Sequence, residues 1–280
     1  MALARRPAHG VPAMSRRDNP DRCATCRMHR ALCICALVPR LVTRTRLAVV
    51  VHHREAPKPT NTGQLAARCL ARATVAIIGQ RDRPNERLAI GDEVQPVVLF
   101  PDDDAPPIAA YAGAARPILL IVPDGTWRQA SKLRRRVPGL AELPCASLPE
   151  AAATAYRLRA EHRTGGLATF EAIARALGVL EGDAGPAIAA AMLHVFRVMV
   201  DRTLWLRGAI GDADVTGGVP PAAQAHSPRG GHSRHPARHP ALPGDDHHEA
   251  LVVERHGAVL EQPADRPLER LLADAEPVAE

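Results

Sequence analysis

The chain has 280 residues, with 36 Lys and Arg against 30 Asp and Glu, a formal net charge of +6 at pH 7. Its 46% hydrophobic and 24% charged residues exclude a wholly disordered chain. No apolar run approaches the roughly 18 residues that a membrane-spanning helix needs, and residues 7–14 do not form an apolar signal core. We therefore expect a cytoplasmic protein with no membrane contact, and the sequence indicates no obligate protein partner.

Four cysteines lie within thirteen residues near the N-terminus: Cys23, Cys26, Cys33 and Cys35. In a reducing compartment such a cluster favours a tetrahedral thiolate site for Zn²⁺ over disulfides. Sulfur would fill all four positions and leave none for water, so the predicted zinc ion is structural. The second pair is separated by one residue where two are usual, and a tighter knuckle is expected.

Short β-branched runs alternate with Ala-rich stretches from about residue 46 to residue 180. The predicted strands cover residues 47–51, 74–78, 97–100 and 118–122. The predicted helices cover residues 62–72, 107–115, 127–136, 170–180 and 186–207. This alternation predicts an α/β fold, a mostly parallel sheet with flanking helices, in which the ligand site lies beyond the carboxyl ends of the strands.

Asp124 and Gly125 follow the last predicted strand, and Thr126 and Trp127 open the next helix. Thr126 suits a helix cap, and the backbone N–H groups of this turn would face a ligand at the strand end. A plain strand-to-helix turn is the simpler alternative for Asp124 and Gly125. In the helix itself, one side carries a cationic ridge of Arg128, Lys132, Arg135 and Arg136.

Such a ridge in a basic chain favours a polyanion such as RNA as the partner. Residues 1–210 carry 30 Lys and Arg against 18 Asp and Glu, a net +12, whereas residues 211–280 carry 6 against 12, a net −6. Residues 216–244 are rich in Pro, Gly, His and Ser. We predict a flexible N-terminus over 1–19, a zinc knuckle over 20–40, a catalytic α/β domain over 41–210, and a disordered acidic tail over 211–280.

Taken together, several motifs resemble those of the DTW-domain family in order and spacing, from about Cys23 to Arg207. They are the four cysteines, His53-x-Glu55, Pro59-Thr-Asn-Thr-Gly63, Leu99-Phe-Pro101, Asp124-Gly-Thr-Trp-Arg-Gln-Ala130, Tyr156-Arg-Leu-Arg159 and Gly166-Leu-Ala-Thr-Phe-Glu-Ala172. The resemblance implies a tRNA-uridine 3-(3-amino-3-carboxypropyl)transferase that uses S-adenosylmethionine, with a fold related to the knotted SPOUT methyltransferases. Two departures are Lys58, where Arg is expected, and Ala168, where Ser is frequent.

The resemblance implies a role for each of these motifs. Asp124 is the candidate base for the uridine N3 proton, or else it orients the ligand. Thr126 bonds the ligand or caps the helix, and Trp127 stacks on a base or, as we prefer, anchors the helix in the core. The candidate cofactor-binding residues are Leu99, Phe100, Pro101, Asp124, Gly125, Gly166, Leu167 and Thr169. Residues 59–63 would close over a ligand or cap a helix. Arg157 and Arg159 join the ridge as candidate RNA-binding residues.

Two alternatives stay open at this point. One is a SPOUT-like RNA methyltransferase that uses the same cofactor, and the other is a non-catalytic zinc-containing RNA-binding protein. The sequence leaves open which uridine of which tRNA would be modified, and the oligomeric state.

Overall fold

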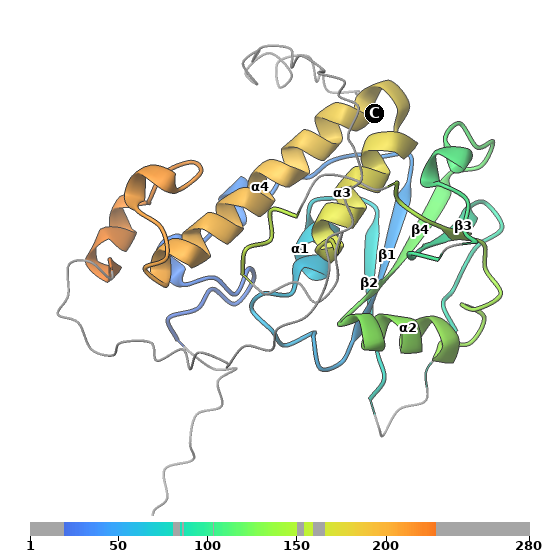
Figure 1. Cartoon of the computed structure of the whole chain (residues 1–280), viewed down its shortest axis with the longest axis horizontal. Coiled ribbons are helices and arrows are strands. Elements are labelled where there is room, and N and C mark those ends of the chain that lie inside the picture. The colour runs from blue at the N-terminus through green and yellow to red at the C-terminus, as the bar shows by residue number, and fades with distance from the viewer. Residues whose placement is uncertain are drawn as a thin grey trace, which may run out of the picture. The chain divides into compact units, whose positions relative to one another are not determined.

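Five parallel strands form one sheet in the order β2-β1-β4-β3-β5 (Figure 1). The computed structural model describes residues 20–80, 85, 87–102, 104–149, 154–158 and 166–227. The strands are β1 (Arg46–His52), β2 (Ala73–Ile78), β3 (Gln95–Leu99), β4 (Ile118–Asp124) and β5 (Cys145–Ala146). The expected α/β class and the four expected strands are confirmed. The two-residue strand β5 was not expected, because so short a strand leaves no run of apolar residues to detect.

Within the described residues, the α-helices are α1 (Thr62–Arg68), α2 (Trp127–Arg136), α3 (Thr169–Leu180) and α4 (Gly185–Leu206). Three of them lie where the sequence predicts them, but α1 ends at Arg68 instead of residue 72. The helix expected over residues 107–115 is wrong, since only a short 3₁₀ turn, Ile108–Tyr111, forms there. Pro107 precedes this turn, and Gly113 beyond it adopts a φ of +73°, a left-handed conformation that ends a helix.

Alternate residues of the central strands enter two separate cores. Val49 and Val51 of β1 face the core shared with α1, α3 and α4, whereas Ala48 and Val50 face the core shared with α2. A strand with both faces buried reads as a continuous apolar run, which explains why β1 is Leu-Ala-Val-Val-Val. The sheet therefore lies between α2 on one side and the other three helices on the other.

Helices α3 and α4 pack closely against one another (Figure 1). Gly178 and Gly185 allow the approach, since a Cβ on Gly185 would lie 2.2 Å from the carbonyl oxygen of Gly178. Phe170 and Phe196 stack with ring centroids 5.0 Å apart, and Tyr156 stacks on Phe196 from the loop before α3. This aromatic column fixes the loop that carries Tyr156 against the helix pair.

The segment Gly182–Leu206, which includes α4, is long and apolar enough, by length and composition, to cross a membrane. No segment of this kind was expected from the sequence. A core helix of a folded domain passes the same test. In this structure Met192, Phe196 and Met199 are buried in the core of the domain, and the helix also carries a buried Asp201 and Arg202.

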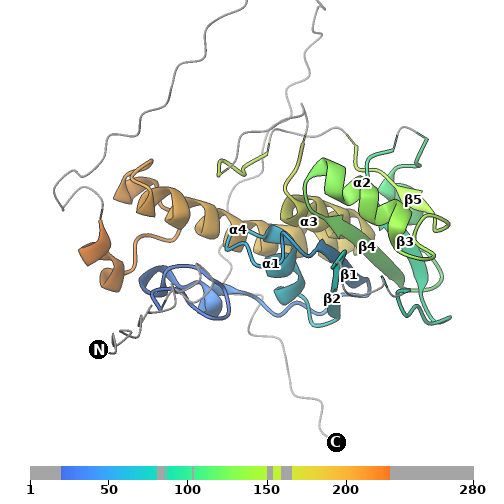
Figure 2. The same cartoon turned by 90° about the horizontal axis from the view of Figure 1, so that it is seen from below.

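Residues 20–40 form the cysteine knuckle, which lies beside the C-terminal part of α4 (Figure 2). The expected boundary of the catalytic domain at residue 210 is too early. Residues 212–226 contain two 3₁₀ turns, with Val215 and Ala223 buried against the same core. Two residues of α4 hold this segment, because Asp201 accepts hydrogen bonds from Thr216 and Trp205 Nε1 donates to Asp212 at 2.8 Å.

The expected flexible N-terminus over 1–19 and the expected tail from residue 228 onward lie outside the described residues, as does Arg159. The knot that the family resemblance implies stays an expectation.

Candidate active site

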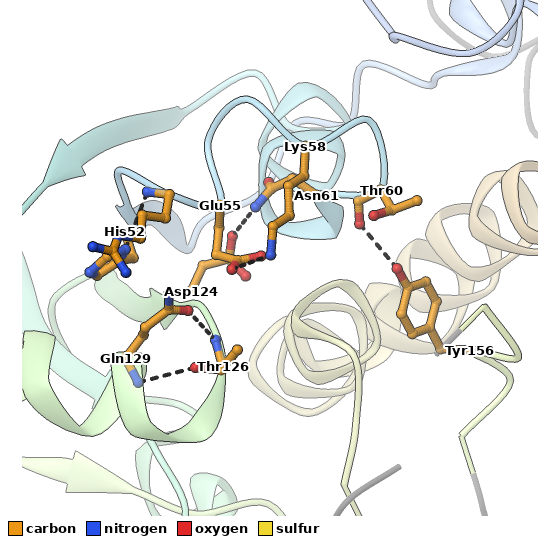
Figure 3. A network of polar contacts seen from close by, with 10 residues as sticks. His52, Glu55, Lys58, Thr60, Asn61, Asp124, Thr126, Gln129 and Tyr156 are labelled. Atoms are coloured by element: carbon orange, nitrogen blue, oxygen red, sulfur yellow. Dashed lines mark hydrogen bonds and ion pairs between the residues drawn. The ribbon is translucent and has the colours of Figure 1, made fainter. Parts of the chain in front are cut away.

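Asp124 is the last residue of β4 and lies at the centre of the sheet's carboxyl edge (Figure 3). It pairs in register with Val51 of the neighbouring strand β1. The connection after β1 leads to α1 on one face of the sheet, and the connection after β4 leads to α2 on the other face. Parallel α/β sheets bind their ligands at such a switch point. Only 5% of Asp124 is exposed, so its carboxylate is held by protein groups.

Both carboxylate oxygens of Asp124 accept a side-chain hydrogen bond. Asn61 Nδ2 donates to Oδ2 at 2.5 Å, and Thr169 Oγ1 donates to Oδ1 at 2.5 Å. Asn61 is the N-cap of α1, and Thr169 is the first residue of α3. The carboxylate thus joins the N-termini of two helices that are more than 100 positions apart in sequence.

The segment 59–63 begins α1. Asn61 Oδ1 accepts from the backbone N–H of Gln64 and so caps α1. Of the two roles expected for residues 59–63, the structure shows the helix cap. Gly63 is buried, and an added Cβ would lie 2.8 Å from both Cγ and Oδ2 of Asp124. Glycine is needed here for close approach and not for a flexible lid.

Thr126 caps α2 through a complete capping box with Gln129. The Thr126 backbone N–H donates to Gln129 Oε1 at 2.7 Å (Figure 3). Thr126 was expected to bond the ligand or to cap the helix, and the structure shows the cap. The cap fixes the turn directly after Asp124 and therefore the position of the first residue of α2, Trp127.

Trp127 is not an anchor in the core, because 39% of the residue is exposed. Its ring meets Phe100 edge to face, with centroids 6.2 Å apart. The Arg134 guanidinium lies over the Phe100 ring, 5.6 Å from its centroid, and pairs with Asp102 at 2.6 Å. Trp127 starts a helix whose buried face begins at Ala130, which explains why the indole ring lies at the rim of the site instead.

Three polar residues, at the end of β1 or just after it, were not assigned a role from the sequence. Glu55 is buried, with 3% exposed, and Lys58 Nζ pairs with its carboxylate at 2.5 Å (Figure 3). His52 accepts from the Arg54 backbone N–H at Nδ1. Burial, followed by the neighbouring charges of His53 and Arg54, lowers the pKa of His52. The signal that points to them is their position at the exit of β1, where the sequence predicts the ligand site.

The residues expected to bind the cofactor are only partly brought together. Thr169 contacts Asp124 directly, and Phe100 contacts Trp127. Leu99 is buried at the end of β3, Pro101 is exposed, and Gly125 lies between Asp124 and the cap of α2. Gly166 and Leu167 are half-buried just before α3. The observed contacts therefore join Thr169 to Asp124 and Phe100 to Trp127, and they do not join the whole set.

The expected cationic ridge on α2 is present. Arg128, Arg135 and Arg136 are exposed and Lys132 is half-buried, while Ala130 and Leu133 face the core. Arg157 is less available than expected, because its guanidinium pairs at 2.6 Å with the buried carboxylate of Asp201. That pairing connects the loop after Tyr156 to α4.

The four sulfurs of the knuckle lie within 4.8 Å of one another and could hold a metal ion such as zinc. The Sγ atoms of Cys23 and Cys35 are 3.7 Å apart, and those of Cys26 and Cys33 are 3.6 Å apart. Tetrahedral coordination with Zn–S bonds of about 2.3 Å requires sulfur separations of about 3.8 Å. Backbone N–H groups of Cys26 and Thr25 lower the pKa of Cys23 to about 6, whereas burial raises the pKa of Cys26 and of Cys33. The residues present fit a zinc ion.

The fold and the site together define an α/β protein whose polar site lies at the switch point of a parallel sheet, beside a cationic helix. Residues 20–204 match the DTW domain, and the chain belongs to the DTW domain family. It is similar to "tRNA-uridine aminocarboxypropyltransferase 2" of Drosophila melanogaster, with 26% identity over 174 residues, which cover 59% of this chain and 69% of that protein. No solved structure matches the chain.

Proposed function

We propose that the protein is a tRNA-uridine aminocarboxypropyltransferase. It transfers the 3-amino-3-carboxypropyl group of S-adenosylmethionine to N3 of a tRNA uridine in the cytoplasm. The observation that carries the proposal is the clasp of Asp124 by Asn61 and Thr169, which unites three of the family's motifs at one point of the sheet. Membership in the DTW domain family and the similarity to a transferase of this name support it.

The reaction forms a bond between uridine N3 and the γ-methylene of the methionine moiety. The bond from that carbon to sulfur breaks, its electron pair goes to sulfur, and methylthioadenosine leaves. The N3 proton needs an acceptor, and in this proposal it passes to the carboxylate of Asp124. Asn61 and Thr169 hold the carboxylate in one orientation.

Trp127 and the cationic ridge form the tRNA-binding side of the site in this proposal. An exposed indole at the rim of a polar site is suited to stacking on an unpaired base, a contact worth about 1–3 kcal/mol per base. Arg128, Lys132, Arg135 and Arg136 extend away from it along α2 and would contact phosphates. Arg159, which lies outside the described residues, stays in the proposed set.

The four cysteines are the proposed ligands of a zinc ion, and the role of this ion is structural. All four coordination positions are sulfur, so no position is open to water or substrate. Arg27, in the middle of the knuckle, donates from Nη1 to the carbonyl oxygen of Ala56 at 2.7 Å. Gln64 Nε2 donates to the same oxygen at 2.9 Å, so the knuckle contacts the loop that precedes α1.

The first experiment separates the three candidate functions. Purified protein is incubated with unmodified tRNA and S-adenosylmethionine, and the nucleosides are analysed by mass spectrometry. We expect a uridine that has gained the aminocarboxypropyl group, together with methylthioadenosine. A gain of one methyl group would indicate the methyltransferase, and an unchanged nucleoside with retained tRNA binding would indicate the non-catalytic RNA-binding protein.

The second experiment tests the role of Asp124. Asp124→Asn keeps the shape of the side chain, and its amide can still accept from Asn61 and donate to Thr169. We expect cofactor binding and thermal stability to be kept while turnover falls roughly 10²- to 10⁴-fold. Thr169→Val is the matched control, since it removes one hydrogen bond and leaves the carboxylate. Turnover unchanged by Asp124→Asn would leave Asp124 with the orienting role alone.

A further inference from the structure

The guanidinium of Arg202 is buried in the last turns of α4, with only 6% of the residue exposed. Its Nη1 donates to two carbonyl oxygens of the knuckle, that of Leu32 at 3.4 Å and that of Cys33 at 3.0 Å. Its Nε is buried and has no hydrogen-bond partner. Burial of a charged group is costly unless an opposite charge compensates it, so this arrangement calls for a negative charge nearby.

No carboxylate supplies that charge among the described residues. The four ion pairs within the described parts of the chain do not include Arg202. Its neighbour Asp201 points elsewhere, because one of its oxygens binds Arg157 and the other binds Thr216. Its hydrogen bond to the carbonyl oxygen of Cys33 instead places Arg202 beside the cysteine cluster. Burial lowers the pKa of Arg202, whereas Cys33 and Cys26 act to raise it.

A second cation approaches the same cluster from another helix. Arg68, at the end of α1, donates from Nη2 to Cys35 Sγ at 3.5 Å. It also has no ion pair among the described residues. Thus one guanidinium from α1 and one from α4 converge on the four cysteines. Arg68 lies in the last turn of α1, where the helix dipole favours positive charge.

The charges of the two arginines and of a metal-bound cluster are complementary. One Zn²⁺ with four thiolates carries a net charge of −2, and the two guanidinium groups together carry +2. We propose that Arg202 and Arg68 are the counter-cations of the zinc–thiolate centre and position its sulfur ligands. This inference rests on the proposed zinc site. Groups around the ligands of a metal site commonly change its affinity 10- to 100-fold when they are replaced.

Arg202→Met tests the proposal most directly, because Met fills the buried space without the charge. Zinc affinity is measured by competition with a chromophoric chelator, and the Co²⁺-substituted protein is followed by its sulfur-to-cobalt absorption. We expect zinc binding 10- to 100-fold weaker in Arg202→Met. Arg202→Lys, which restores a positive charge, should recover most of the affinity. Arg197→Met, on an exposed position of the same helix, is the matched control and should bind zinc like the parent protein.

Thermal unfolding with and without zinc separates a charge role from a packing role. Removal of a buried charge should leave the metal-free Arg202→Met protein at least as stable as the metal-free parent. Its stabilisation by zinc should be smaller. A packing role would instead lower the stability of both forms equally, and this result would overturn the proposal. If Arg202→Met does not fold, Arg68→Met, at a half-buried position, is measured in its place.

Two further outcomes distinguish this inference from the zinc site on which it rests. If the parent protein binds no zinc, or if Cys33→Ser leaves zinc binding unchanged, the zinc site itself is wrong. If the parent binds zinc through the four cysteines and Arg202→Met binds it with the same affinity, the zinc site stands and the counter-cation role is wrong.

Discussion

Gly63 of α1 faces the carboxyl group of Asp124 at the end of β4 so closely that a methyl group on Gly63 would lie 2.8 Å from its Cγ and Oδ2. The first turn of α1 and the carboxylate at the sheet edge therefore depend on one another. Asn61, two residues before Gly63, makes the hydrogen bond that this close approach permits.

Gly63→Ala should separate α1 from Asp124. The new methyl group also meets Val49 Cγ1 at 3.0 Å, so neither neighbour can yield easily. We expect a loss of about 1–3 kcal/mol in the free energy of unfolding, together with loss of transferase activity. Denaturant unfolding measures the first and the nucleoside assay the second. In the control Gly91→Ala, the three atoms nearest to the methyl all belong to the flexible side chain of Glu93. Equal stability of the two variants would contradict the packing argument.

Truncation after residue 211 should destabilise the domain, whereas truncation after residue 227 should not. The shorter chain loses the buried Val215 and Ala223 and the Thr216 bonds to Asp201. It also loses Asp212, the acceptor of Trp205 Nε1. We expect a cost of about 2–5 kcal/mol for the shorter chain. Thermal unfolding of the two truncations beside the full chain measures it, and equal melting temperatures would show that the segment is dispensable.

The salt dependence of tRNA affinity tests the cationic ridge. If Arg135 contacts a phosphate, Arg135→Gln should make the slope of log affinity against log salt shallower by about 0.7 to 0.9. Arg116 is exposed just before β4, at the opposite edge of the sheet, and Arg116→Gln is the matched control. Equal slopes for the two variants would place the tRNA elsewhere on the protein.

His52 should make stability depend on pH. Its pKa in the folded protein is lowered from 6.5, chiefly by burial. As pH falls below about 6.5, the unfolded chain takes up a proton at this position before the folded chain does, so unfolding becomes easier. We expect His52→Asn to flatten the fall in stability between pH 7 and pH 5. His194→Asn, exposed on α4, is the control. An unchanged pH profile for His52→Asn would contradict the assignment.

Much of the fold follows from local patterns. The continuous apolar runs identify β1 and β4, and Thr126 with Gln129 marks the start of α2 at its observed residue. The contacts of Asp124 with Asn61 and Thr169 could not be predicted, because they join residues 63 and 45 positions away. Local spacing contains no information about such pairs.

The packing of residues 212–227 against the domain was missed for a related reason. Residues 212–227 are polar and rich in Gly and Pro, and only Val215 and Ala223 of this segment are buried. What holds the segment is its hydrogen bonding to Asp201 and Trp205 of α4. A usable signal was present in α4, where Asp201 and Arg202 interrupt an otherwise apolar stripe.

The carbonyl oxygen of Ala56 accepts from Arg27 on one side and from Gln64 on the other. These two hydrogen bonds therefore fix the loop between β1 and α1 at Ala56 before a ligand binds. A pre-organised loop has little conformational entropy left to lose on association. Rapid-mixing experiments with S-adenosylmethionine should accordingly show a single concentration-dependent binding phase, without a slower phase from closure of this loop.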